Sequence, residues 1–377
     1  MRNPGRYGFL VVVFWIMMRL ISSGVYAQNS CPPTGQWFDC SNTSIGQTAL
    51  DEMVPGQSYQ GQTGGLYGNW QNSPPAGHLN KALTAASQIQ PINGKIVLMS
   101  IGMSNTNQEF TAFMAQANND SGVSDSIVLV NGAQPTQTAD RWAKNEVVWE
   151  RIPFPPGIGP GDVQVIWLKL SDYPSDFANF QQNIMTVITQ KLPEYGYANV
   201  KLIYVSSRIY AGYTLCLLNP EPLSYETGFV MQKVVLDQIN DTSDGGITYS
   251  NAPVILWGPY LWADGTKANS KGISWSCNNN LNSSQMDYQA DGTHPSAAGE
   301  AKVGAALLNF FKTNTTSKDW FTGEGGSTSP PPSGDVDGDL NGDGLVNIDD
   351  FLKLVAEFVS RSYSIFDLNL VATHFGS

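Results

Sequence analysis

Basic residues and histidines are scarce in this sequence. Lysine and arginine number 20 against 32 aspartates and glutamates, which gives a formal net charge of −12 at pH 7. A chain this acidic does not attract phosphates, so we expect no nucleic acid and no anionic membrane as a partner. Histidine occurs three times, as His78, His294 and His374. The choice of a general base is therefore narrow.

Long apolar runs are also rare. The run "FLVVVFWIMM" follows Arg2 and Arg6 and is about half the ~20 residues that a spanning helix needs. Small residues at Val25 and Ala27 suit signal peptidase cleavage. Residues 1–27 are therefore predicted to be a secretory signal; the alternative, a membrane anchor, is disfavoured by Arg19. We expect a secreted, extracellular protein without a membrane span.

Cysteine is sparse, and no two cysteines have the Cys-x-x-Cys spacing of a metal site. The four are Cys31, Cys40, Cys216 and Cys277. An even number in an oxidising compartment predicts two disulfides. Pairing Cys31 with Cys40 and Cys216 with Cys277 is the simplest connectivity, and the other connectivities stay open.

The stretch "TGEGGSTSPPPSG" at residues 322–334 has the Gly, Ser and Pro content of a linker. It divides the chain into a large domain at 28–321 and a small acidic module at 335–377. The large domain is long enough to form one substantial core, whereas the small module needs extra support.

Short apolar runs alternate with amphipathic stretches in the large domain. The runs are apolar on both faces, as are strands of a covered parallel sheet. They lie at 95–100, 126–132, 163–170, 200–206 and 252–259. Helices are predicted at 107–119, 136–146, 176–191, 225–240 and 297–312. The order predicts an α/β fold, a three-layer α/β/α sandwich with a parallel sheet and an active site beyond the carboxyl ends of its strands.

Three residues at those positions have the chemistry of a catalytic triad. Ser104 follows the first predicted strand, and Asp291 and His294 precede the last helix in "DGTHPSAAG". A serine hydroxyl becomes a nucleophile when a base accepts its proton and a third group orients that base. The alternative for Ser104 is a helix cap, and for the Asp-x-x-His pair a loop contact.

The pattern resembles the SGNH, or GDSL-like, hydrolase superfamily over most of residues 90–312. The resemblance implies a flavodoxin-like sheet, with Ser104 as nucleophile, His294 as base and Asp291 as its orienting acid. It also implies oxyanion donors from the backbone of Ser104 and Gly132.

Two blocks depart from that family's pattern. Gly-Asp-Ser reads Gly102-Met103-Ser104, and the third block, Gly-x-Asn, reads Lys169-Leu170-Ser171. The side-chain oxyanion donor is thus absent or replaced by Ser171, Asn105 or Asn131. Losing one such donor costs about 10²–10³ in rate.

Several other side chains have two interpretations. Arg208 either clamps an anionic substrate group or forms a structural ion pair, which the sequence favours. His78 is interpreted as structural or as part of a substrate loop. Five tryptophans in or beside loops either stack on sugar rings or belong to the core; they are Trp37, Trp70, Trp257, Trp262 and Trp275.

The stretch "DLNGDGLVNIDD" at 339–350 fits a twelve-residue calcium loop in which Gly344 makes the sharp turn. One structural Ca²⁺ is predicted there. Its expected ligands are Asp339, Asn341, Asp343, Leu345, Asn347 and Asp350.

The tail also repeats itself, since "IDDFLKLVAEF" (348–358) recurs as "IFDLNLVATHF" (365–375). Two such copies resemble the type I dockerin, which implies a cohesin-type scaffold as partner. The second loop, 356–367, keeps only Asp367 as a plausible ligand, so a single calcium site is expected. The alternative is a calcium-locked terminal cap.

Together these features predict a secreted serine esterase that removes acyl groups, acetyl above all, from an extracellular polysaccharide through an acyl-enzyme. The alternative is a catalytically impaired carbohydrate-binding or adhesion protein on an SGNH fold, tethered by the dockerin-like tail. A third interpretation makes the tail the working part.

Overall fold

The computed structural model describes residues 39–172, 177–215, 218–241, 246–277 and 286–323. Several predictions lie outside these residues: the signal sequence, nearly all of the linker, the tail with its six expected calcium ligands, Trp37, Cys31 and Cys216. The part of the chain that the structure describes holds no helix long and apolar enough to cross a membrane.

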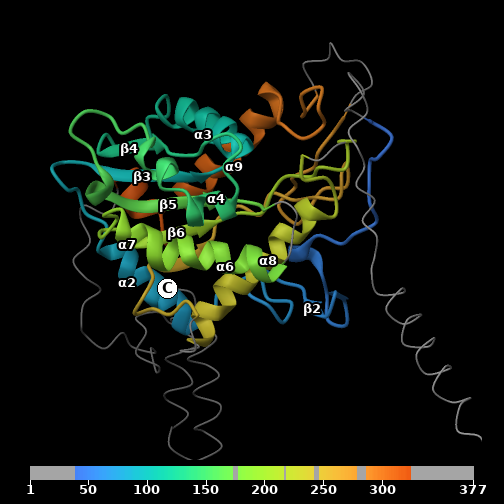
Figure 1. The fold of residues 1–377 in the computed structure, drawn as a ribbon, viewed down its shortest axis with the longest axis horizontal. Coiled ribbons are helices and arrows are strands. Elements are labelled where there is room, and N and C mark those ends of the chain that lie inside the picture. The colour runs from blue at the N-terminus through green and yellow to red at the C-terminus, as the bar shows by residue number, and fades with distance from the viewer. Residues whose placement is uncertain (1–38, 173–176, 216–217, 242–245, 278–285, 324–377) are drawn as a thin grey trace, which may run out of the picture.

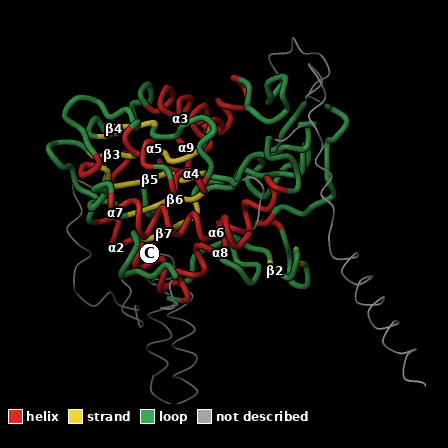
Figure 2. Tube along the Cα trace, viewed as in Figure 1, coloured by secondary structure: helices red, strands yellow, loops and turns green. Residues whose placement is uncertain are grey.

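A five-stranded parallel sheet forms the centre of the domain (Figures 1 and 2). Its strands are β3 (Ile96–Gly102), β4 (Ile127–Asn131), β5 (Val163–Lys169), β6 (Leu202–Val205) and β7 (Val254–Trp257). Their order in space is β4-β3-β5-β6-β7, and every neighbouring pair is parallel. The five predicted apolar runs thus coincide with the five strands, and the α/β class is confirmed. A separate hairpin pairs β1 (Ser58–Tyr59) with β2 (Gln62–Thr63).

Helices connect and flank the strands. The α-helices are α2 (Ala76–Ser87), α3 (Ser104–Ala117), α4 (Ala139–Lys144), α5 (Glu146–Glu150), α6 (Phe177–Thr186), α7 (Leu192–Glu194), α8 (Leu223–Asn240), α9 (Ala297–Thr313) and α10 (Lys318–Thr322). Short 3-10 turns are η1 (Leu50–Glu52) and η2 (Pro160–Asp162), and η3 (Val187–Lys191) is a π turn that continues α6. All five predicted helices are present, the second divided into α4 and α5.

The flanking helices form two groups. Helix α3 packs against α9, whereas α6 packs against both α4 and α8. Parallel strands joined through a helix make right-handed crossovers. The chain leaves β3 toward β4 and then steps the opposite way across β5, β6 and β7, so α3 lies on one face of the sheet and α4, α6 and α8 on the other. The sheet is therefore covered on both faces.

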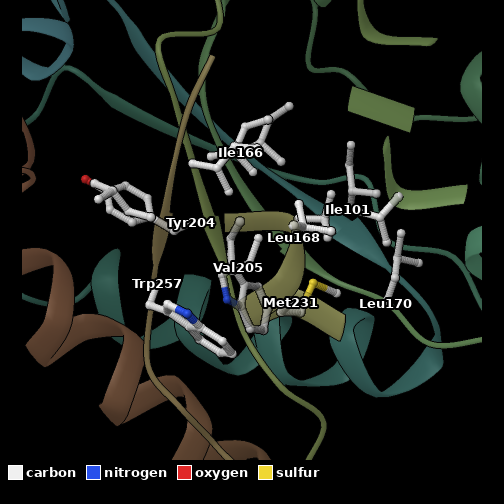
Figure 3. Close-up of a cluster of buried hydrophobic side chains, with 14 of the residues drawn as sticks. Ile101, Ile166, Leu168, Leu170, Tyr204, Val205, Met231 and Trp257 are labelled. Carbon is white, nitrogen blue, oxygen red and sulfur yellow. The ribbon is translucent and has the colours of Figure 1, made fainter. Parts of the chain in front are cut away.

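The core lies along the sheet, and every residue of β3, β5 and β6 is buried. Figure 3 shows side chains of this core from β3 (Ile101), β5 (Leu168) and β6 (Val205) together with Met231 of α8. Each large apolar side chain buried in this way contributes about 1.5–3 kcal/mol of transfer free energy. This burial explains why the strand sequences are apolar on both faces.

The described disulfide joins Cys40 to Cys277, across 237 positions of the chain. The simple pairing of Cys31 with Cys40 and of Cys216 with Cys277 is therefore wrong in both bridges. The backbone amide of Asp39 also donates to the carbonyl of Tyr213 at 2.9 Å, so the start of the described chain lies on the loop that follows β6. Sequence proximity favoured the short pairing, but the fold brings two distant loops together.

Candidate active site

Ser104 is the first residue of helix α3, directly beyond the carboxyl end of β3. The N-cap position is held by Met103, and no side chain caps this helix. The turn is tight, because a Cβ at Gly102 would lie 2.3 Å from Oγ1 of Thr106. The alternative interpretation of Ser104 as a helix cap is therefore wrong, and its hydroxyl is used elsewhere.

The loop before α9 carries His294 and Asp291. Backbone amides of Thr293 and His294 donate to Oδ1 of Asp291 at 3.0 and 2.9 Å, which fixes the carboxylate within its own turn. Asn105, next to Ser104, donates from Nδ2 to the carbonyl of Thr293 at 2.8 Å. This bond ties the start of α3 to the loop that holds the histidine.

Ser104, His294 and Asp291 form a continuous chain of hydrogen bonds. His294 Nε2 lies 2.7 Å from Ser104 Oγ, and His294 Nδ1 lies 2.5 Å from Asp291 Oδ2. A carboxylate at Nδ1 requires the proton on that nitrogen, so Nε2 is free to accept the serine proton. The side chains of His294 and Asp291 are 23% and 25% exposed, which leaves the site open to a substrate.

Hydrogen bonds control the charge of Asp291. Burial raises the pKa of its carboxyl, but bonds from the ring and backbone of His294 and from Thr293 outweigh burial and hold the pKa below its usual value. Asp291 is therefore a carboxylate at neutral pH, as an orienting acid must be.

The backbone amide of Ser104 has no hydrogen-bond partner among the described residues, as expected for the first amide of a helix. This amide belongs to the N-terminal end of α3, where the helix dipole favours a negative charge. The amide of Gly132 instead donates to the carbonyl of Val130 at 3.1 Å, in a turn so tight that a Cβ on Gly132 would lie 2.6 Å from the Ser100 carbonyl oxygen. Of the two expected backbone donors, only that of Ser104 is free in this structure.

The side chains considered as replacements for the missing third-block Asn all have other partners. Ser171 is buried, and its Oγ accepts from Nδ2 of Asn219 at 3.0 Å. Asn131 donates to the carbonyl of Asn107 at 2.8 Å, and Asn105 is bonded to Thr293. None of the three is directed at Ser104 by the bonds that it makes. Asn219, which the sequence analysis did not single out, has no local pattern that would have marked it.

Lys169 occupies the third-block position and forms a buried ion pair. Its Nζ lies 2.6 Å from Oε1 of Glu109, and the two side chains are 1% and 0% exposed. Burial lowers the pKa of Lys169 to about 8, against the opposing charge of Glu109. Glu109 lies on the inward face of α3 beside Phe110. An acid at an apolar position of a helix was the signal that could have identified it.

Arg208 is 97% buried and forms no salt bridge with any described residue. Its backbone amide donates to Oγ1 of Thr227 at 3.0 Å, and the hydrogen bond found for its guanidinium among the described residues goes to the sulfur of Met103, with Nη1 at 4.0 Å from Sδ. The described residues thus provide no partner for the structural ion pair that was expected of Arg208.

His78 and most of the tryptophans belong to the interior. Both ring nitrogens of His78 are bonded, to the hydroxyl of Tyr249 at 2.7 Å and to the carbonyl of Ile255 at 2.8 Å. Trp257, Trp262 and Trp275 are at most 4% exposed, so they cannot stack on sugar rings. Trp70 alone of the described candidates is partly accessible, and its indole donates to the carbonyl of Gln57.

No cluster of three or more histidine, cysteine, aspartate or glutamate side chains that could hold a metal occurs in the described ranges. The ionisable and nucleophilic groups of the candidate site are therefore the triad and the buried side chains of Lys169, Glu109 and Arg208. No protein family matches the sequence, and comparison with curated proteins and with solved structures finds no similar protein.

Proposed function

We propose that this protein is a secreted serine esterase that hydrolyses acyl esters, acetyl esters above all, on an extracellular polysaccharide. The observation that carries the proposal is the hydrogen-bonded chain from Ser104 through His294 to Asp291, placed at the carboxyl end of a parallel sheet. The strand order fits the flavodoxin-like, three-layer arrangement implied by the resemblance to SGNH hydrolases.

The geometry supports a two-step acyl transfer. Ser104 Oγ forms a bond to the ester carbonyl carbon while its proton moves to His294 Nε2, and the carbonyl π pair moves onto oxygen. When that oxyanion collapses, the C–O bond to the alcohol breaks and the alcohol takes the proton from His294. Water then attacks the acyl-enzyme by the same route, releasing the carboxylic acid and restoring Ser104.

Two elements of the site act on charge during these steps. The unpaired amide of Ser104 at the start of α3 is the backbone donor that we assign to the developing oxyanion. The carboxylate of Asp291 stabilises the imidazolium that forms when His294 is protonated. An extracellular glycan as substrate is supported by the predicted secretory signal and by the dockerin-like tail.

Fluorophosphonate labelling of the purified mature protein, read by peptide mass spectrometry, tests the proposal. We expect phosphonylation at Ser104, loss of labelling in His294→Ala, and full labelling in His374→Ala, whose histidine lies outside the predicted catalytic domain. Turnover of 4-nitrophenyl acetate and release of acetate from acetylated polysaccharides then define the substrate. A folded protein that leaves Ser104 unlabelled contradicts the esterase and favours the alternative, a carbohydrate-binding protein.

For the tail we infer that residues 339–350 bind one calcium ion. Five side-chain oxygen donors and one backbone carbonyl at the spacing of a calcium loop support this, together with the acidity of the module. Calorimetric titration of the full chain with Ca²⁺, against Asp343→Ala and an EDTA-treated blank, is the test. A stoichiometry of one that Asp343→Ala abolishes is expected, and no heat of binding contradicts it. Pull-down with cohesins tests the scaffold partner.

A further inference from the structure

Arg208 has a buried guanidinium that forms no salt bridge with any described residue. A guanidinium carries five donors and remains charged in proteins. Here Nε is buried without a hydrogen-bond partner among the described residues, and Nη1 donates to a thioether sulfur, which is a weak acceptor. A buried charge costs free energy unless another group pairs with it or accepts its hydrogen bonds. The position of Arg208 therefore calls for a functional explanation.

The guanidinium reaches the nucleophile's turn from two strands away. Arg208 follows β6, and β5 lies between β6 and β3 in the sheet. Contact with Met103, the residue before Ser104, therefore requires the side chain to cross the carboxyl end of β5. That end is where the third block would place its asparagine.

The base of the Arg208 side chain is held firmly. Ser207 Oγ accepts from the amides of Leu261 and Trp262, both at 3.0 Å, and the Arg208 amide donates to Thr227. Donors fixed in advance of the reaction stabilise a developing charge without reorganisation. The loop after β6 thus has the rigidity that an oxyanion donor needs.

We propose that Arg208 supplies the oxyanion donor that the third block lacks, by hydrogen bonding from its guanidinium to the former carbonyl oxygen in the transition state. The proposal rests on the esterase function given above. As Ser104 Oγ bonds to the carbonyl carbon, the π pair moves onto that oxygen, and Arg208 and the Ser104 amide face it together. No proton is transferred by Arg208.

The surrounding charges favour this role. Glu109 forms its salt bridge with Lys169, and Asp291 forms its own with His294, so neither carboxylate is paired directly with Arg208. Burial lowers the pKa of Arg208, while the negative charges of Glu109, Glu221 and Asp291 oppose that effect. A guanidinium keeps its proton under these conditions, since its reference pKa is above about 12.

The burial of Arg208 also distinguishes an oxyanion from a substrate carboxylate. Arg208 is 3% exposed, so a group that reaches its guanidinium must be small, such as the oxygen of a bound acyl group. A carboxylate carried on a sugar ring would have to bring the ring into the same space. We therefore assign Arg208 to the reacting carbonyl and not to an anionic group elsewhere on the substrate.

The test uses Arg208→Met and Arg208→Ala in the full-length mature protein, with the exposed Arg151→Met as the matched control. For 4-nitrophenyl acetate, a neutral ester, Arg208→Met is expected to lower kcat by about 10²–10³ with KM changed less than about threefold. Phosphonylation of Ser104 slows to a similar extent, because the phosphoryl oxygen occupies the oxyanion position. Added methylguanidinium is expected to raise the kcat of Arg208→Ala in a saturable manner, which a merely structural role would not produce.

The outcomes separate this inference from the proposed function. If wild-type Ser104 does not react, the esterase and the role of Arg208 fall together. If wild-type Ser104 reacts and folded Arg208→Met keeps kcat within about threefold, the role of Arg208 alone is overturned. A change confined to KM with anionic esters would show instead a substrate clamp.

A measurement on the wild-type protein tests the same proposal if the Arg208 variants do not fold. With ¹⁵N-labelled arginine, the buried Nε resonance is expected to shift when Ser104 is phosphonylated, because the adduct brings an oxygen to the guanidinium. A resonance of Arg208 that is unchanged in the fully modified protein overturns the proposal.

Discussion

His294 Nε2 lies 2.7 Å from Ser104 Oγ, although 190 positions separate the two residues in the chain. The contact exists because Ser104 follows β3 and His294 precedes α9, and α9 packs against the helix that Ser104 begins. The sheet thus brings the nucleophile and its base together from opposite ends of the domain. The triad, the loop that holds its histidine and the buried charged groups of the domain give four testable predictions.

Asp291→Asn is expected to lower kcat for 4-nitrophenyl acetate by about 10⁴ while leaving the fold intact. Asparagine accepts the backbone bonds of Thr293 and His294 through Oδ1, but its amide then faces His294 Nδ1. The ring is forced into the tautomer with the proton on Nε2, which cannot accept the serine proton. Steady-state kinetics with the exposed Asp125→Asn as control make the measurement, and a loss below about tenfold contradicts the orienting role.

Sequence predicted the sheet well, because each buried parallel strand carries a local apolar pattern that burial on both faces imposes. It also placed Ser104, Asp291 and His294 at the ends of the right elements. It did not predict the partner of Cys40 or the isolation of Arg208, since both depend on how distant loops meet. A local sequence pattern indicates which residues of a strand or helix are buried. It does not indicate which distant loops come into contact, because that depends on the tertiary structure.

The loop that carries Asp291 and His294 also needs a left-handed backbone conformation at Gly292. Its φ is +67°, and a Cβ would lie 2.5 Å from the carbonyl oxygen of Tyr213. Gly272 has a similar φ of +76° with no atom within 4 Å of a Cβ, so Gly272→Ala is the matched control. Both alanines meet the left-handed penalty of about 1–2 kcal/mol, and only Gly292→Ala adds a backbone clash.

Gly292→Ala is therefore expected to unfold at lower denaturant concentration than Gly272→Ala and to lose activity as the loop moves His294. Urea unfolding and esterase kinetics on both variants provide the comparison. Equal stability and equal kcat for the two would mean that the loop after β6 yields to the extra methyl group without disturbing the triad.

The ion pair of Lys169 and Glu109 predicts a pronounced asymmetry between single and double variants. Lys169→Met leaves the carboxylate of Glu109 buried without its partner and is expected to cost about 3–5 kcal/mol. Replacing both residues by methionine is expected to recover most of that loss, because two apolar side chains fill the space without charge.

A double-mutant cycle from urea unfolding measures this coupling. The exposed pair Lys144 and Asp140 is the control, and Lys144→Met should leave the free energy of unfolding near that of the wild type. Additive losses at Lys169 and Glu109 would contradict the coupling.

Glu221 should make the free energy of unfolding depend on pH. Its carboxyl oxygens accept from the amides of Ala211 and Tyr225 and from the indole of Trp262, at 2.8–3.0 Å. Burial nevertheless dominates and raises the pKa of Glu221 from 4.5 to about 7. Between those two values the folded protein holds a proton that the unfolded chain has released.

Because the folded state binds this extra proton, the free energy of unfolding decreases as the pH rises. Below pH 4.5 both states are protonated at Glu221 and its contribution to stability is complete; as pH rises from 4.5 through 7 that contribution is lost, by about 3 kcal/mol in total. Glu221→Gln cannot titrate, so the difference in unfolding free energy between wild type and variant should fall between pH 5 and 7 and stay constant above pH 8. Urea unfolding of both proteins at each pH gives this difference. The contributions of the other carboxyl groups cancel, because both proteins contain them. A difference that does not vary with pH would mean that the three N–H donors outweigh burial and keep Glu221 ionised.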